Sequence, residues 1–269
     1  MTLAAAERRR FFKRRVTRWT LAAVVLILVA IAIVIAWHSA RGPADRFVFR
    51  SQFEPLIYVI AGLMGLFGFI VGASYVGADW HSGAMLNLLA WHPRRVSVLL
   101  TKLATALGAV LGVTLTLGAL WTGALWFIAS KRGDHTGMTP GAWSSFALTG
   151  ARAVALVLAL TAIGFCLASL GRSTVVAFGA ALIVAIVGEV GVRIMLDQVR
   201  VPDSGRYLLS SYGAAWLTRS WPTTGYPNCV GRCQGASMIT WPQAALVLGG
   251  VVVLVLTAAL WSVRRRDVT

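Results

Sequence analysis

Residues 151–196 read ARAVALVLALTAIGFCLASLGRSTVVAFGAALIVAIVGEVGVRIML, and this stretch decides the fold class of the chain. Two apolar runs, Ala151–Leu170 and Val175–Leu196, are separated only by the residues from Gly171 to Thr174. Each run is long enough to cross a hydrocarbon core of about 30 Å, because a helix rises about 1.5 Å per residue. So short a link suits a tight turn between antiparallel helices. The stretch therefore predicts a hairpin of two membrane-spanning helices.

The rest of the chain continues this pattern. Four further apolar segments can span a membrane: Trp19–Trp37, Leu56–Val76, Val96–Ile128 and Ala244–Val263. Of the 269 residues, 58% are hydrophobic and 13% are charged, whereas soluble domains carry roughly 25% charged residues. We therefore expect an all-α membrane protein with six transmembrane helices, in which residues 19–269 form one domain.

The basic residues predict how the helices are oriented. The net charge is +16, from 25 Lys and Arg against 9 Asp and Glu, and the densest cluster is Arg8–Arg18. Lys and Arg are enriched on the cytoplasmic side of membrane proteins, so we expect a cytoplasmic N-terminus. Six spans then return Arg264–Arg266 to the cytoplasm, in a multi-pass protein of a cell membrane, with a bacterial plasma membrane expected. No basic stretch belongs to a soluble recognition fold, which argues against nucleic acid as a partner.

The segments outside the spans differ in character. We expect residues 1–18 to form a basic cytoplasmic helix along the membrane lipids. The first apolar run is too long for the core of a signal peptide, so it is interpreted as a retained span. Residues 197–241 form the longest external loop, where prolines predict irregular backbone and aromatic residues predict turns or helices at the outer interface.

Residues 77–95, GADWHSGAMLNLLAWHPRR, form the cytoplasmic loop with the most informative pattern. Asp79 is expected to cap a helix, because its carboxylate can accept from free amides at a helix start. Ala84, Leu88 and Trp91 then share one face. The pattern predicts a short amphipathic helix within 78–95. From the residues alone, this helix either anchors two spans at the membrane surface or forms a docking surface for a cytoplasmic partner.

This loop resembles that of the permease subunits of type-2 ATP-binding cassette (ABC) exporters. The matching features are an acidic residue, a Ser-Gly pair, an apolar Leu-Leu pair, Pro-Arg and a following Lys: Asp79, Ser82, Gly83, Leu88, Leu89, Pro93, Arg94, Arg95 and Lys102. The overall plan is also similar, with a basic N-terminal segment, six spans and the longest external loop before the last span. Family members often have Glu and Gly-Thr where this chain has Asp79 and Gly83-Ala84.

The resemblance implies a function and partners. Residues 78–95 would be the coupling helix that sits in a cleft of a cytoplasmic ABC ATPase, with Trp80 and His81 inside it. Two ATPase subunits would bind ATP and Mg, and a second permease copy or paralogue would complete the complex. The fold implied is the type-2 ABC exporter transmembrane domain. The substrate does not follow from the motif.

The chain itself carries no sequence for ATP binding. None of its three lysines, Lys13, Lys102 and Lys131, lies in the Gly-x4-Gly-Lys-Ser/Thr loop that cradles phosphates. We therefore expect a transport subunit that is not itself an enzyme, with no cofactor, no catalytic residue and no metal site in this chain. The alternative is an ATP-independent carrier or channel, which would normally show more polar groups within its spans.

Glu189 and Arg193 are charged residues inside the predicted fifth span. A charge in the bilayer centre is costly, and residues four apart share a helix face, so the two are expected to pair. The pair would either hold helices in register or form a polar wall of a translocation path, and the residues alone leave both open.

Two smaller patterns complete the set. Gly68 and Gly72 have the small-x3-small spacing that permits close helix packing. Cys229 and Cys233 fall in the expected external loop, where a disulfide can form, and the alternative is two free thiols. Cys166 is interpreted as a small apolar core residue.

Overall fold

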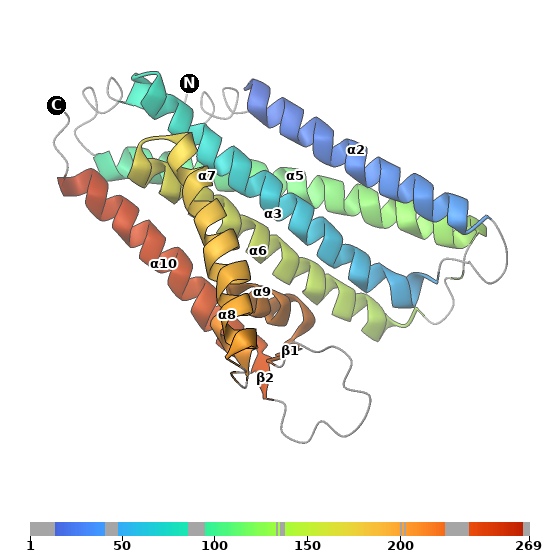
Figure 1. Cartoon of the computed structure of the whole chain (residues 1–269). Coiled ribbons are helices and arrows are strands. Elements are labelled where there is room, and N and C mark those ends of the chain that lie inside the picture. Colours follow the sequence, from blue (N-terminus) through green and yellow to red (C-terminus); the bar gives the residue numbers. More distant parts are fainter. Residues whose placement is uncertain are drawn as a thin grey trace.

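Six long helices run back and forth along the molecule (Figure 1). This computed structural model describes the chain over residues 14–40, 48–85, 95–132, 134, 138–199, 201, 203–223 and 237–265. Within that part, all six helices are long and apolar enough to cross a membrane, which identifies an all-α, multi-pass membrane protein. The first four are α2 (Arg15–His38), α3 (Phe49–His81), α5 (Arg95–Arg132) and α6 (Pro140–Gly171). The fifth joins α7 (Thr174–Ile183), a π-helical segment η2 (Val184–Gly191) and α8 (Val192–Gln198), and the sixth is α10 (Trp241–Arg265).

The six spans predicted from the sequence are confirmed, and each lies inside one of these helices. The helices extend beyond the apolar runs because polar residues can continue a helix outside the hydrocarbon core. The helix expected over residues 1–18 is described only from Arg14, and Arg15–Arg18 form the first turn of α2. Residues 1–13 lie outside the described part of the chain.

The predicted hairpin at residues 151–196 has clear end signals. Arg172 adopts the left-handed conformation (φ 51°) that ends α6, and Ser173 caps α7 by accepting a hydrogen bond from the Val175 amide. At its other end, α6 begins with Pro140 at its first position, and Thr139 accepts from the Ala142 amide. The link from Gly171 to Thr174 is therefore a tight turn, as its length predicts.

Helices α3 and α6 form the centre of the bundle because glycines let their backbones meet. A β-carbon added at Gly72 would collide with the Thr161 carbonyl, and one added at Gly164 with the Phe69 carbonyl. Gly68 faces the Thr161 side chain in the same way. The close packing predicted from Gly68 and Gly72 is thus confirmed, with α6 as the partner.

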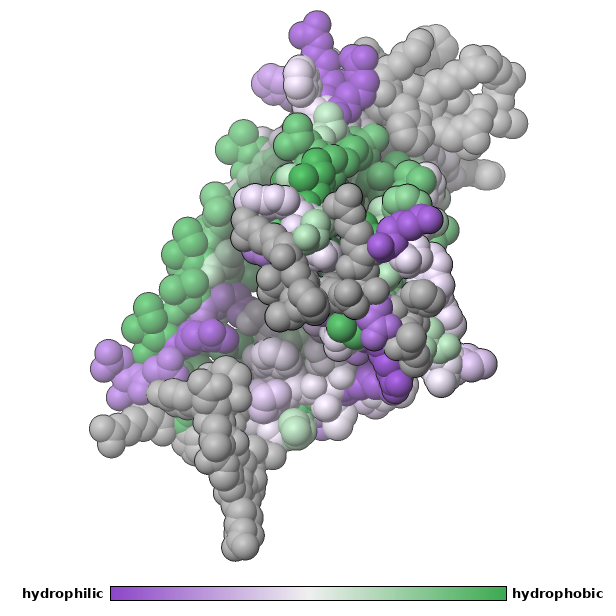
Figure 2. Space-filling view, turned by 90° about the vertical axis from the view of Figure 1, so that its right-hand side faces the viewer, coloured by the Kyte–Doolittle hydropathy of each residue, from purple (hydrophilic) through white to green (hydrophobic). Residues whose placement is uncertain are grey.

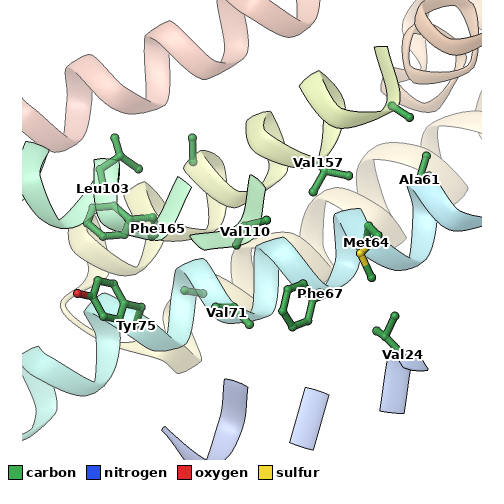
Figure 3. Packing of buried hydrophobic residues seen from close by; sticks show 14 of the residues in the cluster. Val24, Ala61, Met64, Phe67, Val71, Tyr75, Leu103, Val110, Val157 and Phe165 are labelled. Carbon is green, nitrogen blue, oxygen red and sulfur yellow. The ribbon is translucent and has the colours of Figure 1, made fainter. Parts of the chain in front are cut away.

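The apolar core lies along α3. Met64, Phe67, Val71 and Tyr75 of α3 are fully buried, and they belong to one apolar cluster with Val24 of α2, Leu103 and Val110 of α5, and Val157 and Phe165 of α6 (Figure 3). Cys166 belongs to this cluster, as interpreted from the sequence. Helix α3 therefore packs against α2, α5, α6 and α7.

The outer helices present apolar side chains away from the core. Leu26, Val175 and Leu246 are 69%, 77% and 78% exposed. Figure 2 shows such side chains gathered in a band, with hydrophilic residues beyond both of its ends. This is the surface expected of a protein whose solvent is lipid.

The two ends of the bundle differ. At one end, here called the Asp79 end, α2, α5 and α7 begin and α3, α6 and α10 end. The opposite end, the sheet end, holds the segment between the last two spans. It contains η3 (Ser204–Tyr207), α9 (Leu209–Thr218) and the antiparallel pair β1 (Ser220–Pro222) and β2 (Met238–Thr240).

This segment at the sheet end is anchored by hydrogen bonds. Trp216 Nε1 donates to the Arg152 carbonyl of α6 over 2.8 Å. The Thr223 hydroxyl lies 2.5 Å from the Asp203 carboxylate and 2.7 Å from the Ser237 hydroxyl. Hydrogen bonds from Thr223 and Ser237 lower the pKa of the Asp203 carboxyl. Cys229 and Cys233 lie outside the described residues, so their disulfide stays a prediction.

Candidate coupling site

Asp79 is a buried carboxylate at the last turn of α3. Its side chain accepts from Lys102 Nζ of α5 over 2.7 Å and from Arg14 Nη2, just before α2, over 2.5 Å. Asp79 and Lys102 are each 3% exposed. One carboxylate thus joins the beginnings of α2 and α5 to the end of α3. Burial makes these links mutually dependent, because a buried charge is costly without its partners.

Tyr75 lies one helical turn before Asp79 and is enclosed by the same two cations. Arg14 Cζ lies 4.8 Å and Lys102 Nζ lies 5.2 Å from the centroid of its ring. Arg14 also donates to the carbonyls of Ser74 and Tyr75, over 3.2 Å and 2.9 Å. Cation–π contacts strengthen when the groups are shielded from water. Arg14, Tyr75, Asp79 and Lys102 are called the charge cluster below.

The chain turns sharply just after the charge cluster. The Ser82 amide donates to the Ala78 carbonyl over 3.0 Å and the Gly83 amide to the Trp80 carbonyl over 3.2 Å, which closes the end of α3. Gly83 has a φ of +69°, a conformation that glycine adopts without steric cost. The helical backbone resumes at Ala84 and Met85, and Met85 is fully buried.

The expected role of Asp79 as a helix cap is therefore wrong. Asp79, Trp80 and His81 are the last residues of α3, because the helix continues beyond the apolar run that ends at Val76. The carboxylate meets side-chain cations instead of amides at a helix start. The start of the predicted helix at residue 78 is likewise displaced, since the Ser82-Gly83 turn separates α3 from the helical backbone at Ala84.

The turn between α6 and α7 packs against the end of α3. A β-carbon at Gly77 would collide with Thr174, so the turn lies directly on the α3 backbone. Arg172 Cζ lies 5.0 Å from the centroid of the Trp80 ring. Four parts of the chain thus converge beside the Ser82-Gly83 turn: the segment before α2, the end of α3, the beginning of α5 and the α6–α7 turn.

The structure brings together only part of the motif predicted from the sequence. Asp79, Trp80, Ser82, Gly83 and Lys102 surround the base of the loop, and His81 is exposed beside them. Arg95 is the first residue of α5. The remaining predicted residues lie outside the described part of the chain: Leu88, Leu89, Pro93 and Arg94. The predicted amphipathic face and its docking role therefore stay predictions.

Glu189 and Arg193 do not form the predicted ion pair among the described contacts. The Glu189 carboxylate accepts from the Ser210 amide over 3.0 Å and from the Ser210 hydroxyl over 2.5 Å. Residues 184–191 are π-helical, so the α-helical spacing behind the prediction does not apply to Glu189. Ser210 lies in the first turn of α9, where free amides favour a carboxylate. Glu189 therefore holds α9 against the fifth span, and Arg193 is exposed.

Sequence reasoning missed two members of the charge cluster. Arg14 is one of several cations in the basic N-terminal stretch, and Tyr75 lies within an apolar run. The available signal was Asp79 itself, because a carboxylate at the edge of a span needs a cation. Comparison with family models and with curated proteins gave no match for this chain.

Proposed function

We propose that the chain is the permease subunit of an ATP-binding cassette exporter, driven by a separate ATPase that docks at the 82–94 loop. The observation that carries the proposal is the charge cluster at the base of this loop. Any force applied to the loop acts first on the end of α3 and the beginning of α5. Asp79 ties both to the segment before α2.

The packing of α3 supports transmission of such a force. At Gly72 and Gly164, the backbones of α3 and α6 meet with no side chain between them that could absorb a displacement. The Gly77–Thr174 contact adds the beginning of the fifth span. A movement of the loop would therefore shift several spans together, which a transporter needs in order to alternate between two openings.

The proposal includes the partners that the resemblance implies. Two ATPase subunits would bind ATP and Mg, and a second copy or a paralogue of this chain would face the first across the membrane. The fifth span is the least buried of the six, because only 6% of its most apolar stretch is buried. It therefore has surface available for lipid or for that second permease. The Asp79 end would be cytoplasmic, in the plasma membrane of a bacterium.

Site-directed cross-linking tests this function. The starting variant lacks native cysteines, and His81→Cys then places one exposed thiol beside the loop. A thiol cross-linker applied to native membranes should join this variant to a protein that is photolabelled by azido-ATP. Thr139→Cys, at the sheet end, is the matched control and should give no such product.

Purification in mild detergent supplies the opposing outcome. Recovery of a stoichiometric ATPase with the chain supports the proposal. Recovery of the chain alone, together with transport in proteoliposomes that lack ATP, would replace it with the ATP-independent carrier or channel.

A further inference from the structure

Arg152 is a cation at the edge of the apolar part of α6, on the side of the sheet end. It precedes Arg172, which follows the last residue of α6 at the Asp79 end, by 20 positions. That length of helix spans about 30 Å, the thickness of the hydrocarbon core. With Arg172 at one membrane surface, Arg152 therefore lies at the depth of the lipid headgroups at the other surface.

The Arg152 guanidinium has no carboxylate partner among the described residues. Its Cζ lies 5.5 Å from the centroid of the Trp241 ring. Nη1 is enclosed by protein and has no hydrogen-bond partner in the described part of the chain. Nε and Nη2 make no hydrogen bond with a described residue either, but they are not enclosed, since the side chain is only half-buried. An arginine at this depth needs a counter-charge, and these two nitrogens can reach one outside the chain.

Arg219 brings a second positive charge to the same place. It is exposed and follows the last residue of α9. Its carbonyl accepts from the Trp241 amide over 2.9 Å, and the ring of this same Trp241 contacts Arg152. Tyr58 of α3 interacts electrostatically with both guanidinium groups. Parts of α3, α6, α9 and α10 thus meet around Tyr58, Arg152, Arg219 and Trp241, which are called the arginine patch below.

One carboxylate lies at the edge of the arginine patch. Glu54 accepts a hydrogen bond from the Tyr58 hydroxyl over 3.0 Å and forms no ion pair with Arg152 or Arg219 in the described part of the chain. It can offset only one of the two positive charges. Because the Tyr58 hydroxyl already donates to Glu54, the donors left for a ligand belong to the arginines. The patch therefore favours an anionic group that only accepts hydrogen bonds.

An apolar surface continues from the arginine patch toward the membrane centre. Trp241 is the first residue of α10 and is 47% exposed. Ala245 and Leu248 follow it at the i+4 and i+7 positions of the same helix face, and both are partly exposed. Indole rings of this kind settle between the headgroups and the acyl chains of lipids. A molecule with an anionic head and an apolar tail fits both parts of this surface.

We propose that the arginine patch binds the phosphate group of an anionic phospholipid in the membrane leaflet at the sheet end. Nε and Nη2 form one edge of the Arg152 guanidinium, and such an edge donates two parallel hydrogen bonds to phosphate oxygens. Arg219 supplies the second charge, and Trp241 contacts the lipid below its headgroup. The inference does not depend on the proposed exporter function, because the patch belongs to one chain.

Native mass spectrometry of the full chain tests the site. The protein in mild detergent is mixed with equal amounts of phosphatidylglycerol and phosphatidylcholine, and the bound lipids are counted. The wild type should retain phosphatidylglycerol in preference. Arg152→Gln should weaken this binding about 10-fold, because it removes charge-assisted hydrogen bonds. Arg219→Gln should weaken it about 5-fold, the effect of one exposed cation at a membrane surface.

Arg193→Gln is the matched control. Arg193 is an exposed arginine of α8, in the same half of the bundle, and it makes no ion pair or aromatic contact within the described residues. Its replacement removes the same charge and should leave phosphatidylglycerol retention unchanged. Equal losses in Arg152→Gln and Arg193→Gln would overturn the site, because binding would then follow net charge alone. Full retention by Arg219→Gln, whose exposed position tolerates the change, would also count against it.

Inorganic phosphate distinguishes a membrane lipid from a free anion. Phosphate in large excess should leave phosphatidylglycerol bound, because it has no apolar tail to lie along α10. Displacement of the lipid by phosphate would overturn the assignment to phospholipid. Thermal unfolding in nanodiscs provides a second measurement, since a ligand that binds the folded state stabilises it. Phosphatidylglycerol should raise the midpoint of the wild type and of Arg193→Gln more than that of Arg219→Gln, and equal shifts in all three would contradict the proposal.

Discussion

At the scale of single residues, Asp79 has the most consequential surroundings. Its carboxylate accepts hydrogen bonds from both Arg14 and Lys102, and both cations also lie against the Tyr75 ring. Attraction between buried charges gains strength from the low local dielectric, but their desolvation opposes it. The main effect of the charge cluster is therefore to specify which parts of the chain meet, and its contribution to net stability is secondary.

Asp79→Asn should destabilise the protein by about 3–5 kcal/mol, because the variant leaves the Arg14 and Lys102 charges buried without a carboxylate. The measurement is the thermal unfolding midpoint in detergent. Asp197→Asn, at an exposed position of α8, is the control and should change the midpoint little. Equal midpoints for the two variants would show that the charge cluster does not hold the fold together.

The charge cluster also shows how far residue patterns reach. Asp79 and Lys102 are recognisable from their positions at the ends of neighbouring spans. Arg14 is one of several arginines in its stretch, and no periodicity distinguishes it from Arg15 or Arg18. Which arginine pairs with Asp79 depends on where the chain enters α2, and this is a property of the tertiary structure. A sequence pattern therefore predicts that Asp79 needs a cation without predicting which one.

At the scale of elements, the contact between α3 and α6 stands apart from the others. Gly68, Gly72 and Gly164 allow backbone atoms of the two helices to touch. In a membrane, such packing replaces the hydrophobic effect as the source of helix association, because lipid is as apolar as the side chains. The other spans rely more on side-chain contacts and face lipid over much of their surface.

Gly72→Ala should weaken the bundle by about 1–3 kcal/mol, because the new methyl group meets the Thr161 carbonyl, which cannot rotate away. Gly62→Ala lies on the same helix in open space and should be neutral or stabilise by up to about 1 kcal/mol through helix propensity. Chemical unfolding in mixed detergent gives both free energies. A larger loss for Gly62→Ala would contradict the assigned interface.

The fifth span shows where periodicity fails at this scale. Its apolar composition predicts a membrane-spanning helix, and that helix is present from Thr174 to Gln198. The π-helical segment at 184–191 has no distinctive composition, so the sequence does not reveal it. The spacing of an ordinary α-helix then predicts Arg193 as the partner of Glu189, which is wrong. Its true partner, Ser210, lies in a segment whose position depends on packing against α6 and α10.

At the scale of the whole molecule, the number of spans places both ends of the described chain at the Asp79 end (Figure 1). The fold class, the six spans and the α6–α7 turn were predictable, because length, apolar composition and turn residues are local properties. The segments η3, α9 and β1–β2 were predictable only as turns or helices. Their arrangement depends on distant contacts, such as the bond from Trp216 to the Arg152 carbonyl.

Thiol labelling of intact cells should reveal the predicted orientation. In a chain without native cysteines, Thr139→Cys at the sheet end should react with a membrane-impermeant maleimide. His81→Cys at the Asp79 end should react only after the membrane is permeabilised. The reverse pattern would invert the orientation predicted from the basic residues.

The glycine contact between α3 and α6 has a consequence for biosynthesis. During translation, α3 enters the bilayer well before α6 is made, because α5 is synthesised after α3 and before α6. Its glycine face must then meet lipid or the insertion machinery, neither of which matches the close fit that α6 provides. The two-span intermediate of α2 and α3 is therefore loosely associated, and the central pair forms only once the fourth span has been made. Chains truncated after α5 should accordingly be targets for membrane quality-control proteases.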